Sequence, residues 1–177
     1  MTKGSGAEAS PVIRPRHADD VPAAAEALIT VHASDGYPLE GVDRPEEWVD
    51  PPGLIKAWVA EMSGRVVGHV AISHPQGEDA VELYRQRAHG AEEQVGVLAR
   101  LFVLREARNR SVGERLTVAA TTYARQRNIR LVLDVMLKDA AAIRLYERLG
   151  WQRLGTTRHE YGDAQQAEAV CFAAPSP

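Results

Sequence analysis

The segment Val95–Leu104 reads VGVLARLFVL and is almost continuously apolar. Such a run is typical of a strand that is buried on both faces of a parallel sheet. A second run of this kind follows at Arg130–Met136, RLVLDVM. Between the two runs, apolar residues recur at helical spacing from Val112 to Ala124. A strand, a helix and a strand in this order predict two parallel strands that are joined by a crossover helix.

The rest of the chain predicts antiparallel strands on either side of this pair. A short edge strand is expected at Val12–Arg16, and two strands are expected around a turn at Ser63 and Gly64. The segment after Gly150 predicts a closing hairpin. The sequence therefore predicts an α/β fold with a mixed, largely antiparallel central sheet. Flanking helices are expected over residues 20–33, 112–127 and 140–149, with one further helical turn at 45–49 and a short polar helix followed by a loop within residues 78–94.

Length and composition favour one globular domain. The chain has 177 residues, of which 45% are hydrophobic and 25% charged. We expect a flexible tail at residues 1–10 and a single domain at 11–175. The net charge of −3 gives no electrostatic reason to expect binding to nucleic acid or to an anionic membrane.

Several other classes of protein are disfavoured by missing signals. Cys171 is the only cysteine, which excludes an intrachain disulfide, and its apolar neighbours predict a buried thiol. The six histidines show no metal-binding spacing such as HExxH, so no metal is expected. No apolar run approaches the roughly 20 residues of a membrane helix, and the N-terminus lacks the apolar segment of a secretion signal. The cytoplasm is therefore the expected location.

The loop between the first buried strand and its helix allows two interpretations. It reads RNRSVGERL from Arg108 to Leu116. The first amides of a helix have no intrahelical acceptor, and together with the helix dipole they favour an anion. In the other interpretation, Ser111 and Glu114 form a capping box and the loop is an ordinary helix start.

Two separated motifs resemble those of the acetyl-CoA-dependent N-acetyltransferases of the GNAT superfamily. The family loop has Arg or Gln, two residues, Gly, one residue, then Gly or Ala. Here Arg108 and Gly113 match this pattern, and Ser111 stands where the first glycine would be. The later family motif is matched by AAAIRLYERLGW, in which the characteristic residues are Ala142, Leu145, Tyr146, Leu149, Gly150 and Trp151.

The resemblance implies that the two parallel strands splay apart and that acetyl-CoA, as co-substrate, inserts between them. The end of the first strand would pair its backbone with the pantetheine arm, and the loop amides would hold the pyrophosphate. A serine at position 111 is expected to occupy the helix N-cap without strain, and Glu114 is expected to turn away from the anion or to pair with Arg110 or Arg115. The implied cofactor-binding residues are Leu101, Phe102, Val103, Arg108, Asn109, Arg110, Ser111, Val112, Gly113, Glu114 and Asp139.

The implied reaction is direct transfer of the acetyl group to a primary amine. Tyr146 matches the family tyrosine that is proposed to protonate the departing thiolate; its alternative role is to pack on its own helix. Asp139 stands where the family commonly has asparagine, and a role as helix N-cap is favoured. The general base is left open among Glu82, Glu92, Glu93, His32 and His69.

The acceptor side is expected at residues 33–48 and 74–94. The candidate acceptor-binding residues are Asp35, Tyr37 and Trp48. The two aromatic rings could instead anchor the loop. The acidic residues of this segment fit a solvated loop equally well. The acceptor is expected to be a small-molecule or peptide amine. Two alternatives remain, a non-catalytic acyl-CoA-binding regulatory module and an acyltransferase for longer acyl groups, and the closing hairpin could support a homodimer.

Overall fold

A computed structural model describes residues 9–89, 92–161 and 163–176, so most of the expected tail at residues 1–10 lies outside the described part. The core is a seven-stranded sheet in the order β1-β2-β3-β4-β5-β7-β6, in which β4 and β5 are parallel and every other neighbouring pair is antiparallel. This confirms the predicted mixed sheet with one parallel pair. The strands are β1 Val12–Pro15, β2 Leu54–Met62, β3 Arg65–Ser73, β4 Gln94–Val103, β5 Ile129–Met136, β6 Gln152–Tyr161 and β7 Gln165–Ala173.

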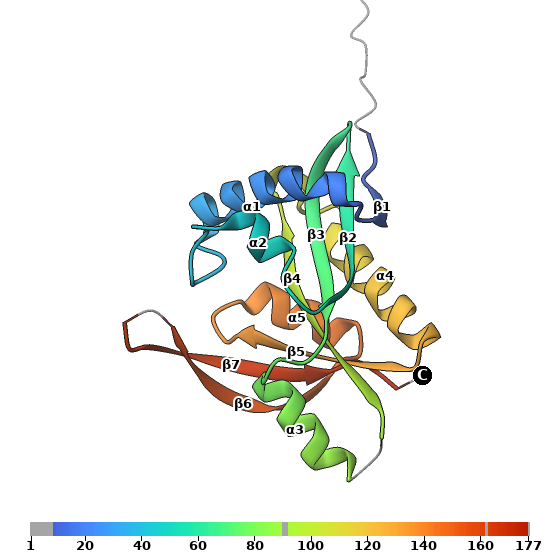
Figure 1. Cartoon of the computed structure of the whole chain (residues 1–177), viewed down its shortest axis with the longest axis vertical. Coiled ribbons are helices and arrows are strands. Elements are labelled where there is room, and N and C mark those ends of the chain that lie inside the picture. The colour runs from blue at the N-terminus through green and yellow to red at the C-terminus, as the bar shows by residue number, and fades with distance from the viewer. Residues whose placement is uncertain (1–8, 90–91, 162, 177) are drawn as a thin grey trace, which may run out of the picture.

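Helices cover both faces of the sheet (Figure 1). The helix α1 and the short α2 lie together over β3 and β4, while α4 crosses the opposite face from β1 to β5. The helix α3 packs on β5, β6 and β7, on the face that carries Val97 and Val132. The α-helices are α1 Val21–Asp35, α2 Pro45–Val49, α3 Asp79–Ala88, α4 Val112–Gln126 and α5 Ala140–Arg148, with short 3₁₀ turns at Ala18–Asp20 and Arg105–Ala107.

The two parallel strands separate part of the way along their length. They pair over four positions, from Gln94 with Ile129 to Val97 with Val132. Beyond this point β4 continues against β3 as far as Val103, and β5 continues against β7 as far as Met136. The sheet therefore contains an internal gap that opens toward the C-terminal ends of β4 and β5, which is the end where open α/β sheets bind ligands.

A β-bulge bends β4 beside this gap. The register with β3 shifts between the pair Ala71–Ala99 and the pair His69–Phe102. Arg100 lies at the shift with a φ of 57°. Such a bulge adds one unpaired residue to the strand and re-aims the side chains that follow it. The nearly continuous apolar character of VGVLARLFVL gives no sign of this irregularity, so the sequence predicted the strand without the bulge.

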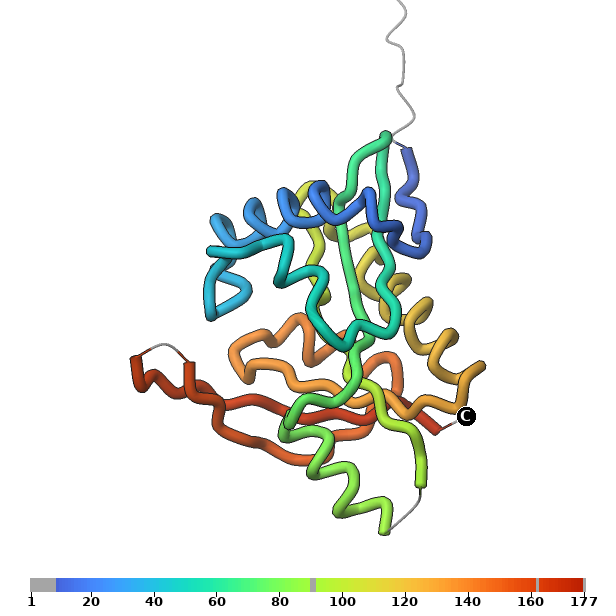
Figure 2. The backbone as a smooth tube through the Cα atoms, viewed as in Figure 1, coloured from blue at the N-terminus to red at the C-terminus, as the bar shows by residue number. Residues whose placement is uncertain are grey.

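The last third of the chain forms the predicted helices and hairpin, with small differences in the residues at which these elements end. The helix α4 ends at Gln126 rather than at Asn128, which has a left-handed φ of 54°. The strands β6 and β7 form the closing hairpin, which extends as a long arm at one side of the molecule (Figure 2). Among the helices of the described residues, none combines the length and the apolar character needed to cross a membrane.

Candidate active site

The loop between β4 and α4 adopts left-handed backbone where the family motif has glycine. Ser111 has φ 59° and ψ 23°, and Asn109 has φ 62°. Ser111 is the N-cap of α4 as expected, but the expectation that it lies there without strain is wrong, because left-handed backbone costs a residue with a Cβ roughly 1–2 kcal/mol. Glycine adopts this conformation freely, and Ser111 adopts it although it carries a Cβ.

The first turn of α4 leaves its amides available. The first intrahelical bond runs from the Arg115 amide to the Ser111 carbonyl at 2.9 Å. The amides of Val112, Gly113 and Glu114 therefore have no acceptor inside the helix. A Cβ on Gly113 would lie 3.7 Å from Leu145 and 3.9 Å from Val103, so the first turn faces both α5 and the end of β4.

The capping box that the sequence allowed is not formed. The N-cap Ser111 makes no side-chain capping hydrogen bond. Glu114 turns away and accepts a hydrogen bond from Arg148 on α5 at 3.1 Å. The expectation that Glu114 turns away is met, although its partner is Arg148 rather than Arg110 or Arg115; the Arg115 side chain instead donates to the Pro11 carbonyl at 2.7 Å.

Asp35 ties the end of α1 to this loop. Its carboxylate accepts hydrogen bonds from Arg105 at 3.1 Å and from Arg108. Arg108 also donates to the Val103 carbonyl at 3.1 Å. The Arg108 guanidinium holds the pKa of Asp35 below its ordinary value. Asp35, predicted on the acceptor side, therefore contacts the expected cofactor loop.

Tyr146 lies on the other side of the gap, on α5. The residue is 5% exposed, and its ring packs against Trp151 and Phe172 at centroid distances of 5.5 and 5.9 Å. Burial, with a smaller contribution from the negative charge of Asp139, raises the pKa of the Tyr146 hydroxyl. Asp139 occupies the N-cap position of α5 as expected, without a side-chain capping hydrogen bond. The packing role and an acid role for Tyr146 are compatible with this placement.

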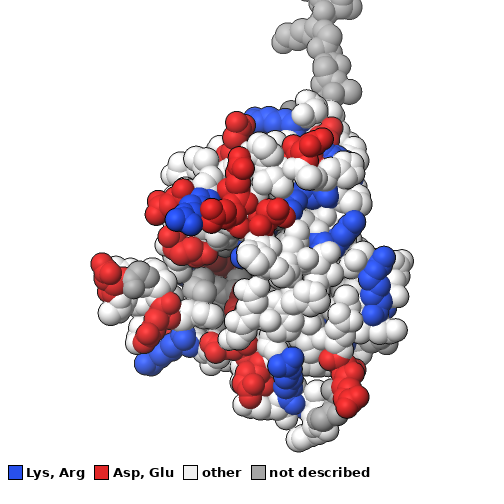
Figure 3. Space-filling model, in the orientation of Figure 1, with Lys and Arg blue, Asp and Glu red and all other residues white. Residues whose placement is uncertain are grey.

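Two aromatic rings pack together here, Tyr37 from the segment between α1 and α2 and Trp48 from α2. Tyr37 precedes a cis peptide bond to Pro38, and its ring meets Trp48 edge-on at 5.7 Å. Burial raises the pKa of Tyr37, and the nearby Tyr146 adds to the effect. Trp48 lies 5.1 Å from the Arg100 guanidinium and donates its indole hydrogen to Glu40 at 2.8 Å. Tyr37, Trp48 and Arg100 thus form a chain of contacts, and Tyr146 lies close enough to Tyr37 to raise its pKa. Acidic side chains gather outside this segment, over α2 (Figure 3).

His69 is fully buried beneath the bulge, and both of its ring nitrogens contact neighbouring groups. One ring nitrogen lies 3.1 Å from the Arg16 guanidinium, which can only donate, so the other carries the hydrogen and donates to the Arg100 carbonyl at 2.9 Å. The ring stacks on Phe102 at 5.3 Å. Burial lowers the pKa of His69 to about 4. Of the five suggested bases, His69 is thus engaged in holding the bulge.

A polar cluster that the sequence analysis did not identify lies on the face covered by α3. Asp134, on β5 just beyond the last β4–β5 pair, accepts a hydrogen bond from the Cys171 thiol at 3.0 Å. His159 on β6 places its Nε2 3.9 Å from Asp134, and Asp79 lies at the start of α3. Burial raises the pKa of Asp134. The sequence feature that could have revealed this cluster is Asp134 itself, a charged residue inside the largely apolar run RLVLDVM.

No metal centre accompanies these groups. Within residues 9–89, 92–161 and 163–176, no three His, Cys, Asp or Glu side chains are arranged to hold a metal ion. The cluster and the gap therefore consist of proton donors and acceptors, backbone amides and aromatic rings.

Comparison with known proteins finds curated relatives of this chain. A mycothiol acetyltransferase of Rhodococcus opacus (strain B4) is 31% identical over 115 residues, which cover 64% of this chain and 34% of that protein. A mycothiol acetyltransferase of Acidothermus cellulolyticus is 33% identical over 130 residues, covering 71% of this chain and 38% of that protein. The chain thus spans little more than a third of the length of these curated relatives.

Solved structures share the fold at low sequence identity. Arabidopsis thaliana NAA60, solved in complex with acetyl-CoA, superimposes with a TM-score of 0.70 at 18% identity, covering 93% of this chain and 97% of that one. The ribosomal-protein-S18-alanine N-acetyltransferase of Escherichia coli gives a TM-score of 0.67 at 17% identity, covering 93% of each chain. In the sequence itself, residues 24–151 match the acetyltransferase (GNAT) family, to which this chain belongs.

Proposed function

We propose that the protein is an N-acetyltransferase that transfers the acetyl group of acetyl-CoA to a primary amine. The observation that carries this proposal is the meeting of three features at one end of the sheet. The gap between β4 and β5, the first turn of α4 and Tyr146 lie together, since Leu145, the neighbour of Tyr146, borders Gly113. Membership of the GNAT family and the acetyl-CoA complex of the NAA60 fold relative support the same co-substrate.

The residues around the gap fit acetyl-CoA. The amides from Ser111 to Glu114 would receive the pyrophosphate at the positive end of the α4 dipole, since side-chain capping does not occupy them. The unpaired side of β4 from Leu101 to Val103 would pair with the amides of the pantetheine arm as an added strand does. Arg110 lies in the same loop, and Asp139 is the N-cap of α5.

Tyr146 is the candidate general acid. Acetyl-CoA supplies the acetyl group as a thioester, and its departing sulfur must gain a proton. A hydroxyl whose pKa is raised by burial stays protonated at neutral pH, so Tyr146 holds the proton that the sulfur needs. Thiols have an ordinary pKa near 8.5, so the thiolate is a weaker base than the Tyr146 phenolate, and the transfer must be driven by reprotonation of Tyr146 from the amine nitrogen.

Asp134 is the candidate general base. It lies on β5 next to Leu133, whose partner in β7 is Phe172, the ring that Tyr146 contacts from the other face. The acid and the base thus flank the same stretch of β5 from opposite faces. Burial raises the pKa of the Asp134 carboxylate, which strengthens it as a proton acceptor. An amine that reaches the face of β5 covered by α3 would meet Asp134 there.

The acceptor is proposed only as a primary amine, of a small molecule or of a peptide. The name of the mycothiol acetyltransferases favours a small molecule, whereas the name of the fold relative from Escherichia coli favours the N-terminus of a protein. Tyr37 and Trp48 would line the acceptor side. Asp35 would support this side indirectly, through its ion pairs with Arg105 and Arg108. We propose that residues 11–175 act as one catalytic domain.

Thiol release from acetyl-CoA, measured across a panel of small amines and peptides, tests this function. We expect turnover with at least one amine, and a loss of roughly 10²-fold or more in kcat for Tyr146→Phe and for Asp134→Asn. The affinity for acetyl-CoA, measured by calorimetry, should change less than about threefold in both variants. Tight binding without turnover on any amine would contradict the proposal and favour an acyl-CoA-binding module. Faster turnover of longer thioesters would instead identify a different acyl donor.

A further inference from the structure

We propose that Asp134, His159 and Asp79 form a proton path from the acceptor side of the gap to solvent, so that the acceptor amine is taken up as its protonated ammonium ion. This inference rests on the proposed function, in which an amine must lose a proton before it attacks. It assigns a substrate charge state and adds two residues to the reaction.

Three side chains from three different elements make up this path. The Nε2 atom of His159 on β6 lies 3.9 Å from Asp134 Oδ2 on β5 and 4.0 Å from Asp79 Oδ2 at the start of α3. The exposed fraction of the side chain rises along the series, from 13% for Asp134 to 31% for His159 and 47% for Asp79. The series therefore leads from the sheet interior to the surface.

The His159 ring lies between the two carboxylates, and its Nε2 atom is hydrogen-bonded to neither of them. Its Nε2 is buried and has no hydrogen-bond partner among the described residues. A settled charged pair would close to about 2.7–2.9 Å, whereas both separations here are about 4 Å. A small ring rotation, or one water molecule, therefore connects the same nitrogen to Asp134 or to Asp79. Imidazole is the side chain that most readily takes up and releases a proton near neutral pH.

The remaining neighbours leave one oxygen of Asp134 for this purpose. The Cys171 thiol donates to Oδ1, while Oδ2 faces His159. The nearby backbone of Ala80 on α3 lowers the pKa of Asp134, against the larger effect of burial. Burial and the neighbouring carboxylate raise the pKa of Cys171 to about 12, so the thiol stays protonated and does not compete for the transferred proton. Thr157 lies behind the thiol, with 3.8 Å between its hydroxyl oxygen and the sulfur.

The path moves one proton and leaves the electron pairs in place. The ammonium N–H bond breaks, its electron pair stays on nitrogen, and an O–H bond forms on Asp134. The proton then passes to His159 Nε2 and on to Asp79 or water, which returns Asp134 to its carboxylate form. The proton that the departing sulfur receives comes from Tyr146, which is replenished by the second proton that the amine nitrogen loses. One proton per turnover is thus released to solvent.

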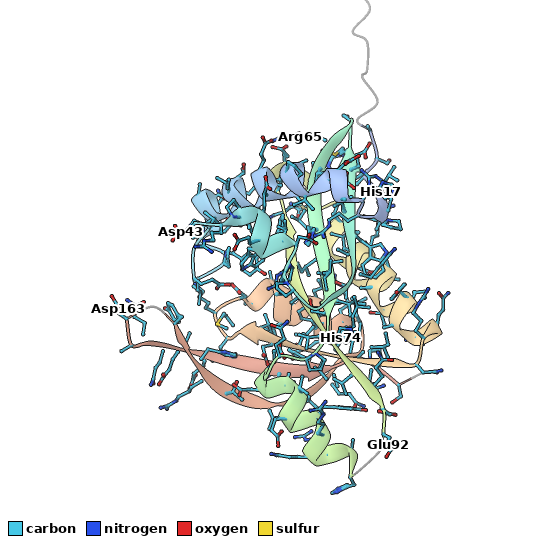
Figure 4. The ribbon with its side chains drawn as sticks, viewed as in Figure 1. His17, Asp43, Arg65, His74, Glu92 and Asp163 are labelled. Atoms are coloured by element: carbon cyan, nitrogen blue, oxygen red, sulfur yellow. The ribbon has the colours of Figure 1, made fainter. Side chains whose placement is uncertain are left out.

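Replacing His159 tests the path, because glutamine keeps a polar side chain but cannot relay a proton. In dilute buffer we expect His159→Gln to lower kcat by roughly tenfold and to raise the solvent deuterium isotope effect on kcat, with the KM for acetyl-CoA unchanged. Added imidazole should restore at least half of the lost rate. Asp79→Asn, at the exposed end, should show a smaller effect of the same kind. The control is His17→Gln, since His17 lies at the far end of the sheet (Figure 4).

The outcomes separate this path from the proposed function. If Asp134→Asn is inactive while His159→Gln matches the wild type in rate, isotope effect and response to imidazole, the path is wrong and the base stands. If no amine is turned over by the wild type, the proposed function itself fails. A loss of rate in His159→Gln that imidazole does not restore, or an unfolded variant together with an unaffected Asp79→Asn, also overturns the path.

Discussion

Replacing His69 with glutamine removes a buried titratable group while keeping both of its hydrogen bonds possible. The amide oxygen of glutamine can accept from Arg16, and the amide nitrogen can donate to the Arg100 carbonyl. The two proteins should then differ in how their free energy of unfolding depends on pH. The wild-type histidine must remain neutral when folded, since it is 0% exposed and faces a guanidinium.

The magnitude follows from the two pKa values of His69. Its pKa is about 4 in the folded protein and 6.5 in the unfolded chain. Because the folded pKa is the lower one, the unfolded chain binds the proton first on acidification. The stabilisation is complete above pH 6.5 and is lost as the pH falls toward 4. At 1.36 kcal/mol per pKa unit, this loss amounts to roughly 3 kcal/mol for His69.

Urea unfolding of both proteins at intervals from pH 7.5 to 4.5 measures this difference. Carboxylates that are common to both proteins contribute equally, so the difference between the two curves isolates His69. We expect the wild type to be the more stable near pH 7.5 and to lose about 2–3 kcal/mol relative to His69→Gln by pH 4.5. Parallel curves over this range, or a His69 imidazole that titrates by NMR near pH 6.5 in the folded protein, would refute the reasoning.

Three further predictions concern the loop and its supports. Ser111→Gly should raise the free energy of unfolding by up to about 1 kcal/mol, because relief of left-handed strain exceeds the added chain entropy, and calorimetry should find acetyl-CoA affinity equal or better; abolished binding would count against the account of this loop. Gly113→Ala should stabilise α4 by about 0.5–1 kcal/mol in denaturant unfolding, since its Cβ has ordinary contacts at 3.7 and 3.9 Å, and a destabilised variant would contradict that packing. Asp35→Asn should lower the free energy of unfolding by about 1 kcal/mol or less at pH 7, because its arginine partners are well exposed. The difference from wild type should shrink as the pH falls through the lowered pKa of Asp35. A difference that does not change with pH would exclude the ion pairs as its source.

Periodic apolar patterns carried most of the fold prediction. The runs at β4 and β5 and the helical spacing across α4 depend on burial that repeats along the chain, so the sequence alone indicated the parallel pair and its crossover. The β4 bulge was not predicted, because Arg100 adds one residue to a run that is apolar on both sides of it. Pairings between distant elements leave no local pattern, which is why the links of Arg16 to His69 and of Asp35 to Arg108 were not foreseen.

The candidate site was predicted in part for the same reason. Tyr146 and the loop at residues 108–114 belong to contiguous motifs, whereas the cluster of Asp134, His159 and Cys171 joins three strands that are brought together only by folding. Ser111 shows the converse limit. Its residue type favours a capping box, and the tertiary position of the loop imposes the conformation of the glycine that it replaces.

The separation of β4 from β5 gives this sheet an exposed edge in its interior as well as at its margins. Unpaired strand edges normally invite the addition of another protein strand, with aggregation as the result. Here helices α4 and α5 border the opening, where Leu145 lies beside Gly113. Under the proposed function, a slender chain that carries its own amide groups, such as the pantetheine arm of the co-substrate, would occupy this inner edge and pair with it.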